Sequence, residues 1–395
     1  MLMNTPLLPV PAVPATPAPA VAHDPALQAF IDQVQRTHAS GGALWIRGGA
    51  TKDFYGETPV AASGAPLDVL DTRALHGTSS YEPTELVVTT RCGTPLAELE
   101  ALLATQGQCL PFEPPHFAPG ATVGGMVAAG LAGPARAAVG SVRDFVLGAT
   151  LLNGRGEVLT FGGQVMKNVA GYDVSRLLAG SLGTLGVIVE VSLKVLPLAP
   201  ATLTLRLEMD QASALAQLHA WGGQPLPLNA SAWWHGSLLV RLRGAIAAVQ
   251  AARTRIGGEV VNEAEAQPFW NGLRNHADEY FDTARTAVQA DSGSERGFAL
   301  WRLSVPQTAP LLALPGEQLI EWAGGQRWLC SAAPAATVRA AASQVGGHAV
   351  LFDALDKSAG VFAPLSAPLA RIHRTLKTAF DPAGVFNPGR LYPGL

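Results

Sequence analysis

Glycine is concentrated in four short segments of the N-terminal half, and this spacing constrains the fold more than any other feature. The segments are WIRGGATKDFYG (45–56), PFEPPHFAPGATVGGMVAAG (111–130), GPARAAVGSVRDFVLG (133–148) and AGSLGTLGVI (179–188). Glycine permits positive φ and lets main-chain N–H groups approach a neighbour or a ligand closely. Successive N–H groups in such turns form a concavity that binds anions. One such turn is ordinary, but four of them predict a large phosphate-bearing ligand.

The common nucleotide-binding signatures are absent from these segments. No stretch matches G-x-x-x-x-G-K-[ST], and the G-x-G at Gly154 and Gly156 has Leu159 in place of the third glycine. The sequence therefore predicts neither a P-loop nor a dinucleotide-binding Rossmann turn.

Composition narrows the class of protein. Apolar residues make up 48% of the 395 residues and charged residues only 14%, which fits a large buried ligand, a partner subunit or simply an alanine-rich composition. The net charge of −3 gives no reason to expect nucleic acid. Cys92, Cys109 and Cys330 are widely separated, so this chain alone builds neither a disulfide framework nor a cysteine-ligated iron–sulfur cluster. The histidines show no H-x-H or H-x-x-x-H spacing, and we expect no metal site.

Four regions follow one another along the chain. Residues 1–24 form a Pro/Ala-rich tail that we expect to be disordered or extended. Residues 25–200 combine a helix from Pro25, strands around the glycine segments and a hairpin at Asn153–Gly156. Residues 201–365 read as strand–helix units without an internal sequence repeat, and residues 366–395 as a helix and a Pro/Gly-rich tail. We predict an α+β protein without a transmembrane segment, soluble in the cytoplasm, with attachment to a partner left open.

The fourth glycine segment is preceded by KNVAGYDVSRLL (167–178), which reads as a helix and places Asp173 as a helix cap. From Val187 onward, apolar residues alternate with polar ones, which predicts a strand with one buried face.

Taken in order, the motifs resemble a known family. R-G-G-x-T (47–51), P-G-x-T-V-G-G (119–125), G-S-x-x-D-x-V (140–146), K-N-x-x-G-Y-D (167–173) and G-S-x-G-T-L-G-V-I (180–188) are similar to the FAD-binding domain of the vanillyl-alcohol-oxidase/PCMH superfamily. Within it, RGGATKDFYG and the closing DPAGVFNPGRLY resemble the FAD-binding subunits of bacterial glycolate oxidases. The resemblance implies a two-subdomain FAD-binding domain, an α+β cap domain for substrate or interface, and a C-terminal segment that returns to pack near the flavin.

The resemblance also implies which residues meet FAD. The first segment would wrap the pyrophosphate, the second would supply the other phosphate and a flavin contact, the third would lie beside them, and the fourth would approach the adenosine and the flavin. The residues are Arg47, Gly48, Gly49, Ala50, Thr51, Lys52, Asp53, Pro119, Gly120, Ala121, Thr122, Val123, Gly124, Gly125, Gly140, Ser141, Asp144, Gly183, Thr184, Leu185, Gly186, Val187 and Ile188. On this interpretation, the closely spaced glycines of the fourth segment let the backbone approach a flat cofactor.

Some members of the superfamily bind flavin through a histidine after the first glycines. Here Ala50, Thr51 and Lys52 stand there, so we expect non-covalent FAD. Lys52 and Lys167 each have two interpretations, a partner of phosphate or a solvated lysine. Arg371, His373, Asn387 and Arg390 are weak catalytic candidates, and His373 between Arg371 and Arg374 is also typical of a basic surface.

The implied function is that of an FAD-binding subunit of a multi-subunit glycolate oxidase or dehydrogenase. It would help to oxidise glycolate, a small 2-hydroxy acid, to glyoxylate, and pass electrons to an iron–sulfur (F-type) subunit beside a catalytic flavin (D-type) subunit. The complex would be cytoplasmic or peripheral on the inner face of the membrane. The metal-binding histidine motif of the D-type subunit is absent, which argues against independent catalysis. Two alternatives stay open, a self-sufficient flavin oxidoreductase of the same fold and a non-catalytic assembly subunit.

Overall fold

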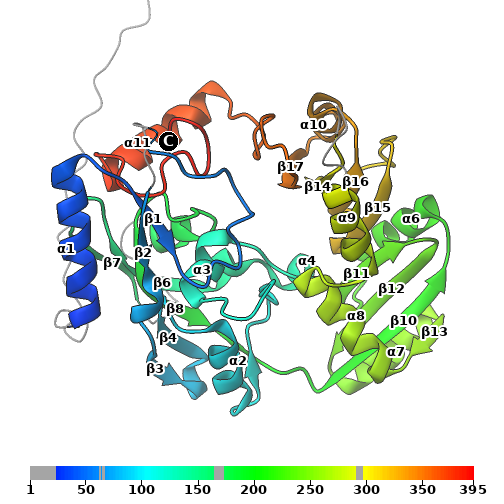
Figure 1. Ribbon diagram of the computed structural model, residues 1–395. Coiled ribbons are helices and arrows are strands. Elements are labelled where there is room, and N and C mark those ends of the chain that lie inside the picture. The colour runs from blue at the N-terminus through cyan, green and yellow to red at the C-terminus, as the bar shows by residue number, and fades with distance from the viewer. Residues whose placement is uncertain (1–23, 62–63, 65–66, 164–172, 291–296) are drawn as a thin grey trace, which may run out of the picture.

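The computed structural model describes residues 24–61, 64, 67–163, 173–290 and 297–395. Figure 1 shows two modules side by side, an N-terminal module and a module built on a large second sheet, which we call the cap. The chain crosses between them twice, once after β9 and once between β17 and α11 (Figure 1). Among the described residues, no helix has the length and apolar character needed to cross a bilayer.

The N-terminal module contains two small sheets and one five-stranded antiparallel sheet of order β3-β4-β8-β6-β7. Its strands are β1 (Leu44–Arg47), β2 (Asp68–Asp71), β3 (Thr78–Glu82), β4 (Val87–Arg91), β5 (Gln108–Cys109), β6 (Val146–Leu152), β7 (Val158–Gly162), β8 (Val187–Lys194) and β9 (Leu196–Pro197). Its helices are α1 (Pro25–Ser40), α2 (Leu96–Ala104), α3 (Val123–Ala129), α4 (Arg136–Val139) and α5 (Val142–Phe145), with the short 3₁₀ turns η1 (Thr72–Ala74), η2 (Pro83–Glu85) and η3 (Ser175–Leu178).

Several local predictions agree with these elements. Asp24 caps α1 by accepting from the N–H of Ala26, and Gly41 ends the helix at φ 65°. β6 and β7 form the hairpin predicted around Asn153–Gly156. β8 begins at Val187 as the alternation predicts, although Ile188 and Ser192 on the opposite face are buried as well, because this strand lies inside the sheet.

The helix predicted over residues 167–178 is not found where the chain is described. Residues 164–172, which include Lys167 and Tyr172, lie outside the described residues. Beyond them only η3 forms, and its N-cap is Val174. Asp173, predicted as a helix cap, instead accepts from the Ser175 hydroxyl and pairs with Arg176.

The cap sheet has eight strands in the order β13-β10-β12-β11-β15-β16-β14-β17. They are β10 (Ala201–Glu208), β11 (Leu228–Trp234), β12 (Ser237–Gly244), β13 (Glu259–Val261), β14 (Ala299–Ser304), β15 (Glu317–Glu321), β16 (Gln326–Ser331) and β17 (His348–Asp353). The remaining helices are α6 (Gln211–Gly222), α7 (Ile246–Ile256), α8 (Glu263–Asn275), α9 (Glu279–Ala290), α10 (Ala335–Gln344) and α11 (Ala367–Phe380), with the turn η4 (Trp322–Gly324).

The two halves of the cap sheet repeat one topology. In chain order, the first half runs 4-1-3-2 across the sheet and the second half runs 2-3-1-4, so the second strands, β11 and β15, meet in the middle. The halves are thus related by an approximate two-fold arrangement of strands. The sequence shows no repeat because this topology depends on which strands neighbour one another, and hydrophobic periodicity does not encode that order.

Side chains alternate between the two faces of the cap sheet. Trp301, Leu303 and Leu351 pack with α10 on one face, where α6 and α7 also cover the first half. Leu300 and Phe352 point to the other face, which packs against α8, α9 and residues of the N-terminal module such as Tyr55. The inner face of the cap therefore forms the boundary with the N-terminal module, and we call this boundary the seam.

A buried ion pair closes one part of the seam. Arg241 on β12 donates to both carboxylate oxygens of Glu113, at 2.7 and 2.8 Å, and only 4% of the Arg241 side chain is exposed. Glu113 also accepts from the N–H of Ala135 at 3.0 Å, and Arg243 lies 3.4 Å away. The Glu113 carboxylate thus joins the loop before the second glycine motif to the cap sheet.

We expect Glu113→Gln to lower the free energy of unfolding by about 3 kcal/mol or more, because it leaves the Arg241 charge buried without its counter-ion. Urea denaturation measures this loss. Glu259→Gln is the matched control, because the Glu259–Arg206 pair is 3.6 Å apart and 68% of the Glu259 side chain is exposed. The control should change stability by no more than about 0.5 kcal/mol. Equal effects of the two substitutions would contradict a stabilising role for the buried pair.

Candidate functional site

The first two glycine segments lie directly against each other. A Cβ added to Gly49 would lie 1.7 Å from the carbonyl oxygen of Gly120, and one added to Gly48 would lie 2.3 Å from the Thr122 hydroxyl. Neither position can carry a side chain without separating the two loops. The glycines therefore bring the loop after β1 into contact with the turn that starts α3.

The loop after β1 presents unpaired main-chain donors. Among the hydrogen bonds of the described residues, none uses the N–H groups of Gly49, Ala50, Thr51 or Lys52 as donors. Ala50 is held at φ 59°, a left-handed conformation that is uncommon for a non-glycine residue. Buried or half-buried N–H groups are normally paired, so four consecutive free donors in a turn form a ready site for an anion.

Lys52 adds a positive charge to this loop. Its ammonium lies 3.4 Å from the Thr51 hydroxyl and 5.5 Å from the ring centre of Phe117, and the ion pairs of the described residues include none for it. Burial, and then repulsion from Arg274, lowers the pKa of Lys52 to about 8. A buried ammonium without a carboxylate is costly, and an anionic ligand would remove that cost. Asp53 does not serve this purpose, because it pairs with Arg47.

The C-terminal tail holds this loop in shape. The Arg390 guanidinium, from a side chain only 5% exposed, donates to the carbonyl oxygens of Lys52, Asp53, Tyr55 and Glu57 at 2.9–3.3 Å. With its carbonyl groups turned toward Arg390, this stretch of loop is fixed from the side of the tail. We call the contacts that Arg390, Asn387 and Lys377 make with these loops the C-terminal clamp.

Asn387 and Lys377 complete the C-terminal clamp. The Asn387 side chain accepts from the N–H of Ile46 at 2.8 Å and donates to the carbonyl of Leu182 at 2.6 Å, which ties β1 to the fourth glycine segment. Lys377 on α11 pairs with the buried Asp381 at 2.7 Å and donates to the carbonyl of Thr184 at 2.8 Å.

The tail residues predicted as catalytic candidates occupy other roles. Asn387 and Arg390 are buried, and their side chains bind main-chain groups of the glycine loops, so they support the site and are not placed for proton transfer. Arg371 and Arg374 are exposed on α11, and His373 packs edge-on against Tyr392 at 5.7 Å. Arg371, His373 and Arg374 therefore fit the second interpretation from the sequence, a basic surface on α11.

The glycines of the fourth segment have packing reasons as well. A Cβ on Gly183 would lie 2.7 Å from Asn387 Nδ2, and one on Gly186 would lie 2.6 Å from the carbonyl of Leu152. Gly180 differs, since a Cβ there would meet nothing within 4 Å, and its φ of 83° alone favours glycine. Gly183 and Gly186 therefore avoid collisions with neighbouring protein, and their approach to a flat cofactor stays a prediction. Thr184, Leu185, Val187 and Ile188 are likewise buried in the protein.

The second and third segments are also partly committed to the protein. The N–H groups of Val123, Gly124 and Gly125 bind Thr94 O, Cys92 O and Thr122 Oγ1, so these three donors are not free for a phosphate. Pro119, Gly120 and Ala121 form the turn that faces the first loop. In the third segment, Ser141 and Asp144 form a capping box at α5, and Gly140 precedes it at φ 100°.

A cavity of about 670 Å³ lies in the seam, and its size is that of a typical cofactor site. We call it the seam cavity. The N-terminal module contributes the third segment (Arg136, Gly140, Ser141, Asp144) together with Gly130 and Gly180, and the cap contributes Arg302, Trp322 and His348. Arg302 also donates to the Tyr55 hydroxyl at 3.3 Å, which connects the cavity to the chain just after the free donors of the first loop.

The seam cavity is electropositive. Burial lowers the pKa of the Arg136 guanidinium, and repulsion from Arg302 across the seam adds to this effect. The Nε of Arg302 is buried and has no hydrogen-bond partner among the described residues. Burial, and then Arg302, also lowers the pKa of His348, so its imidazole is neutral at pH 7. Two guanidinium groups and a neutral imidazole in one cavity can bind a carboxylate and accept a proton.

Sequence reasoning missed Arg136, Arg302 and His348 as site residues. Arg136 lies inside the third glycine segment, but Arg302 and His348 sit on strands of the cap far away in sequence. No motif marks them, and only the packing of the cap against the N-terminal module brings them to one cavity.

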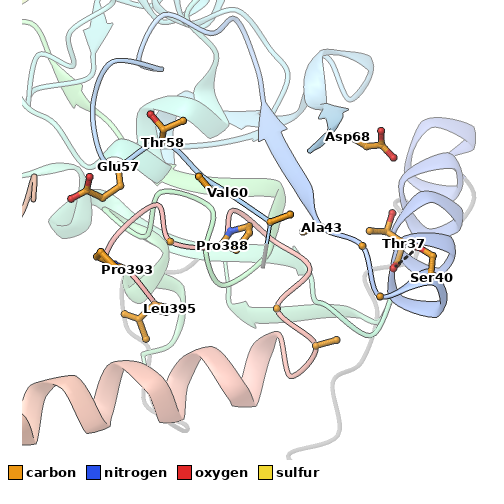
Figure 2. A pocket seen from close by; sticks show the side chains of 17 residues that line it. Thr37, Ser40, Ala43, Glu57, Thr58, Val60, Asp68, Pro388, Pro393 and Leu395 are labelled. Carbon is orange, nitrogen blue, oxygen red and sulfur yellow. Dashed lines mark hydrogen bonds between the residues drawn. The ribbon is translucent and has the colours of Figure 1, made fainter. Parts of the chain in front are cut away.

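A second cavity among the described residues is larger than the seam cavity but is unsuited to a dinucleotide. Figure 2 shows this space of about 870 Å³ between α1 and the C-terminal tail. Its charged lining residues are Glu57 and Asp68, both acidic, and they would repel a diphosphate. We therefore assign the candidate site to the first loop and the seam cavity.

Comparison with known proteins indicates FAD as the cofactor. The model of the family described as FAD binding domain matches residues 27–162. The chain is 48% identical to glycolate oxidase subunit GlcE of Escherichia coli (strain K12) over 368 residues, which is 93% of this chain and 98% of that protein. A D-2-hydroxyglutarate dehydrogenase of Xanthomonas citri pv. viticola is 30% identical over 46% of this chain and 36% of its own length.

Solved structures support the same fold. Alkyldihydroxyacetonephosphate synthase superimposes with a TM-score of 0.60 at 16% identity, covering 91% of this chain and 75% of that one. At this identity the likeness concerns the fold, which is that of the vanillyl-alcohol-oxidase/PCMH type, as the sequence motifs predicted. Both modules of the chain take part in the match, since it covers nearly the whole chain.

We expect FAD affinity to fall as the pH rises through about 8, because only the protonated Lys52 attracts a diphosphate and its pKa without ligand is about 8. Titration of the apoprotein with FAD between pH 6.5 and 9.5, followed by flavin fluorescence, measures this slope. Lys52→Met should weaken binding at pH 7 and flatten the slope. Lys194→Met removes a charge from β8 and should leave both unchanged. A slope that persists in Lys52→Met would exclude Lys52 as its origin.

We expect Asn387→Ala to cost about 2–5 kcal/mol of unfolding free energy, because it leaves the Ile46 N–H and the Leu182 carbonyl unpaired in a buried place. FAD content per chain should fall with it. Asn262→Ala is the control. It removes an exposed helix cap from α8, which costs about 1 kcal/mol, and should leave FAD content intact. Normal stability and FAD content in Asn387→Ala would show that the C-terminal clamp does not depend on this side chain.

Proposed function

This chain belongs to the family of FAD-binding glycolate oxidase subunits, and on that premise we propose that it binds FAD non-covalently at the seam and oxidises glycolate there to glyoxylate, as one subunit of a larger complex. The observation that carries the proposal is the seam cavity, which is lined by Arg136 from the N-terminal module and by Arg302 and the neutral His348 from the cap. Arg302 links this cavity to the end of the first loop through its hydrogen bond to the Tyr55 hydroxyl.

The residues fit the charge and shape of FAD. The free N–H groups of Gly49 to Lys52, with the Lys52 ammonium, are suited to its diphosphate. Gly130 and Gly180 open one wall of the seam cavity, where the flavin ring has room between the two modules. Ala50, Thr51 and Lys52 offer no histidine or cysteine for a covalent link to the ring, which supports non-covalent binding.

The same cavity supplies groups for a 2-hydroxy acid. Arg302, with its unpaired Nε, and Arg136 would hold the carboxylate from opposite walls of the seam. His348 would accept the hydroxyl proton as the C–H bond breaks with its electron pair and the carbonyl of glyoxylate forms. Bound FAD supplies the two-electron acceptor for this step, and flavins can pass electrons on singly.

We propose that the electrons leave through an iron–sulfur subunit and that a second flavin subunit completes the complex. A curated relative of part of this chain, glycolate oxidase subunit GlcD of Bacillus subtilis, is 32% identical over 30% of the chain and 26% of its own length, which supports a complex of several subunits. The free thiols, of which Cys92 and Cys330 are buried, suit a reducing compartment. We therefore place the complex in the cytoplasm or at the inner face of its membrane.

Anaerobic addition of glycolate tests the proposal. The purified complex should show the visible flavin spectrum, and glycolate should bleach the flavin bound to this chain. Because the relatives include flavin subunits, the experiment is done with complex reconstituted from this chain loaded with FAD and a partner flavin subunit made FAD-free by mutation. A flavin on this chain that glycolate leaves oxidised, but that a reduced partner subunit bleaches, would replace oxidation by electron relay. If the chain binds no FAD in the complex, the proposal is wrong and the non-catalytic assembly role is the alternative that stands.

We expect Arg302→Gln to raise the KM for glycolate about 10- to 100-fold, because a charge-assisted hydrogen bond is worth about 1.5–3 kcal/mol. Arg155→Gln, in the exposed β6–β7 turn, is the control and should leave KM unchanged. His348→Gln should lower kcat instead. In the unmodified protein, kcat/KM should fall only below neutral pH, because the lowered pKa keeps His348 unprotonated at pH 7. A KM unaffected by Arg302→Gln would contradict this placement of the carboxylate.

A further inference from the structure

The turn between β15 and β16 is strained at two consecutive residues. Trp322 and Ala323 both have φ 55°, and Gly324 follows at φ 92°. Non-glycine residues rarely adopt this conformation, and two in succession persist only where the surroundings impose them. Gly324 and Gly325, the next two residues, could have taken the left-handed positions in a turn shifted along the chain. The turn therefore spends conformational energy to place the Trp322 side chain.

Four contacts hold Trp322 in the seam. Its indole N–H donates to the carbonyl of Gly133 at 3.1 Å, and the Arg136 guanidinium lies 4.6 Å from its ring centre. Its carbonyl accepts from Gln307 at 3.1 Å, and the N–H of the following Ala323 donates to the Ser231 hydroxyl at 2.9 Å. The indole, 8% exposed, thus reaches from the cap to the third glycine segment of the N-terminal module.

Trp322 stands between two cavities. The seam cavity lies on one side, and a second space of about 230 Å³, which we call the side cavity, lies on the other. The two share Ala137, Gln307 and Trp322 as wall residues. The seam cavity carries arginines and a histidine, whereas the residues that line the side cavity are uncharged and include Leu218, Trp221, Leu226 and Leu228.

We propose that Trp322 is a specificity-determining residue that limits the ligand of the seam cavity to short 2-hydroxy acids by closing the side cavity. The inference rests on the proposed function and names the substrate class of that same site. With its carboxylate between Arg136 and Arg302, an acid the size of glycolate fits on the near side of the indole. A longer aliphatic chain directed toward Ala137 and Gln307 meets the indole, and behind it lies the uncharged side cavity, whose wall includes leucine and tryptophan side chains as well as polar ones.

The position of Arg136 supports this assignment. Its guanidinium lines the seam cavity and at the same time lies over the face of the Trp322 ring. The residue that would bind the carboxylate is therefore in contact with the residue that would exclude the chain. The distance from carboxylate to indole is fixed by this contact, which is the geometry a length selector requires.

Trp322→Gly is the decisive substitution, because glycine adopts a φ of 55° without strain and removes the whole indole. In the complex, its kcat/KM for 2-hydroxyhexanoate relative to that for glycolate should rise about tenfold or more over the unmodified ratio. Trp322→Phe keeps most of the bulk but loses the bond to Gly133, and should keep the preference for glycolate. Ala323→Gly relieves the neighbouring strained residue without opening the cavity and should also keep it.

Direct binding separates this inference from the proposed function. Calorimetric titration of FAD-loaded complex with 2-hydroxyhexanoate should show tighter binding to Trp322→Gly than to the unmodified protein, whether or not either is turned over. If glycolate does not bleach the flavin but this affinity gain is found, oxidation by this chain fails and the length selector stands. If glycolate bleaches the flavin and neither the ratio nor the affinity changes in Trp322→Gly, the length selector is wrong. Should Trp322→Gly not fold, Trp322→Asn, which also tolerates positive φ, gives the same two readouts.

Discussion

The C-terminal tail holds the glycine loops together, and the candidate site depends on that contact. Glycine-rich chain has little side-chain packing of its own and loses much conformational freedom on folding. Here the missing restraint comes from the side chains of Lys377, Asn387 and Arg390, which bind main-chain groups of two separate glycine segments. A segment more than three hundred residues away in sequence thus fixes the loop after β1. Because Arg390 binds the carbonyl groups of this loop, its free N–H groups keep a fixed direction.

The proposed chemistry takes place where two modules of different character meet. The N-terminal module offers main-chain donors and small residues, which suit a cofactor, whereas the cap supplies Arg302 and His348 on neighbouring strands. On this proposal, neither set alone would bind both the cofactor and a 2-hydroxy acid. The buried Glu113–Arg241 pair and the Trp322–Gly133 hydrogen bond fix the distance between the modules at separate points of the seam. The unfavourable proximity of Arg136 and Arg302 is maintained by these contacts, so binding of an anion there relieves repulsion already present in the fold.

Sequence patterns predicted the local elements and the cofactor better than the site. The β6–β7 hairpin and the start of β8 follow from turn chemistry and alternation, and the order of motifs indicated an FAD-binding fold. Glycine was harder to interpret, because Gly183 and Gly49 avoid collisions with protein atoms rather than only with a ligand. Asn387 and Arg390 looked like reactive groups in the sequence, yet burial and main-chain partners make them supports. Arg302 and His348 were not predicted at all, since their meeting with Arg136 is a property of tertiary packing.

The double crossing of the chain between the modules has a kinetic consequence. Linked at two ends and latched by a buried ion pair between them, the cap cannot swing aside about a single hinge. The seam cavity nevertheless opens to solvent, because its wall residues Arg136 and His348 are exposed. A small acid could therefore enter and leave while the two modules stay fixed, so its exchange would not wait for a motion of the cap.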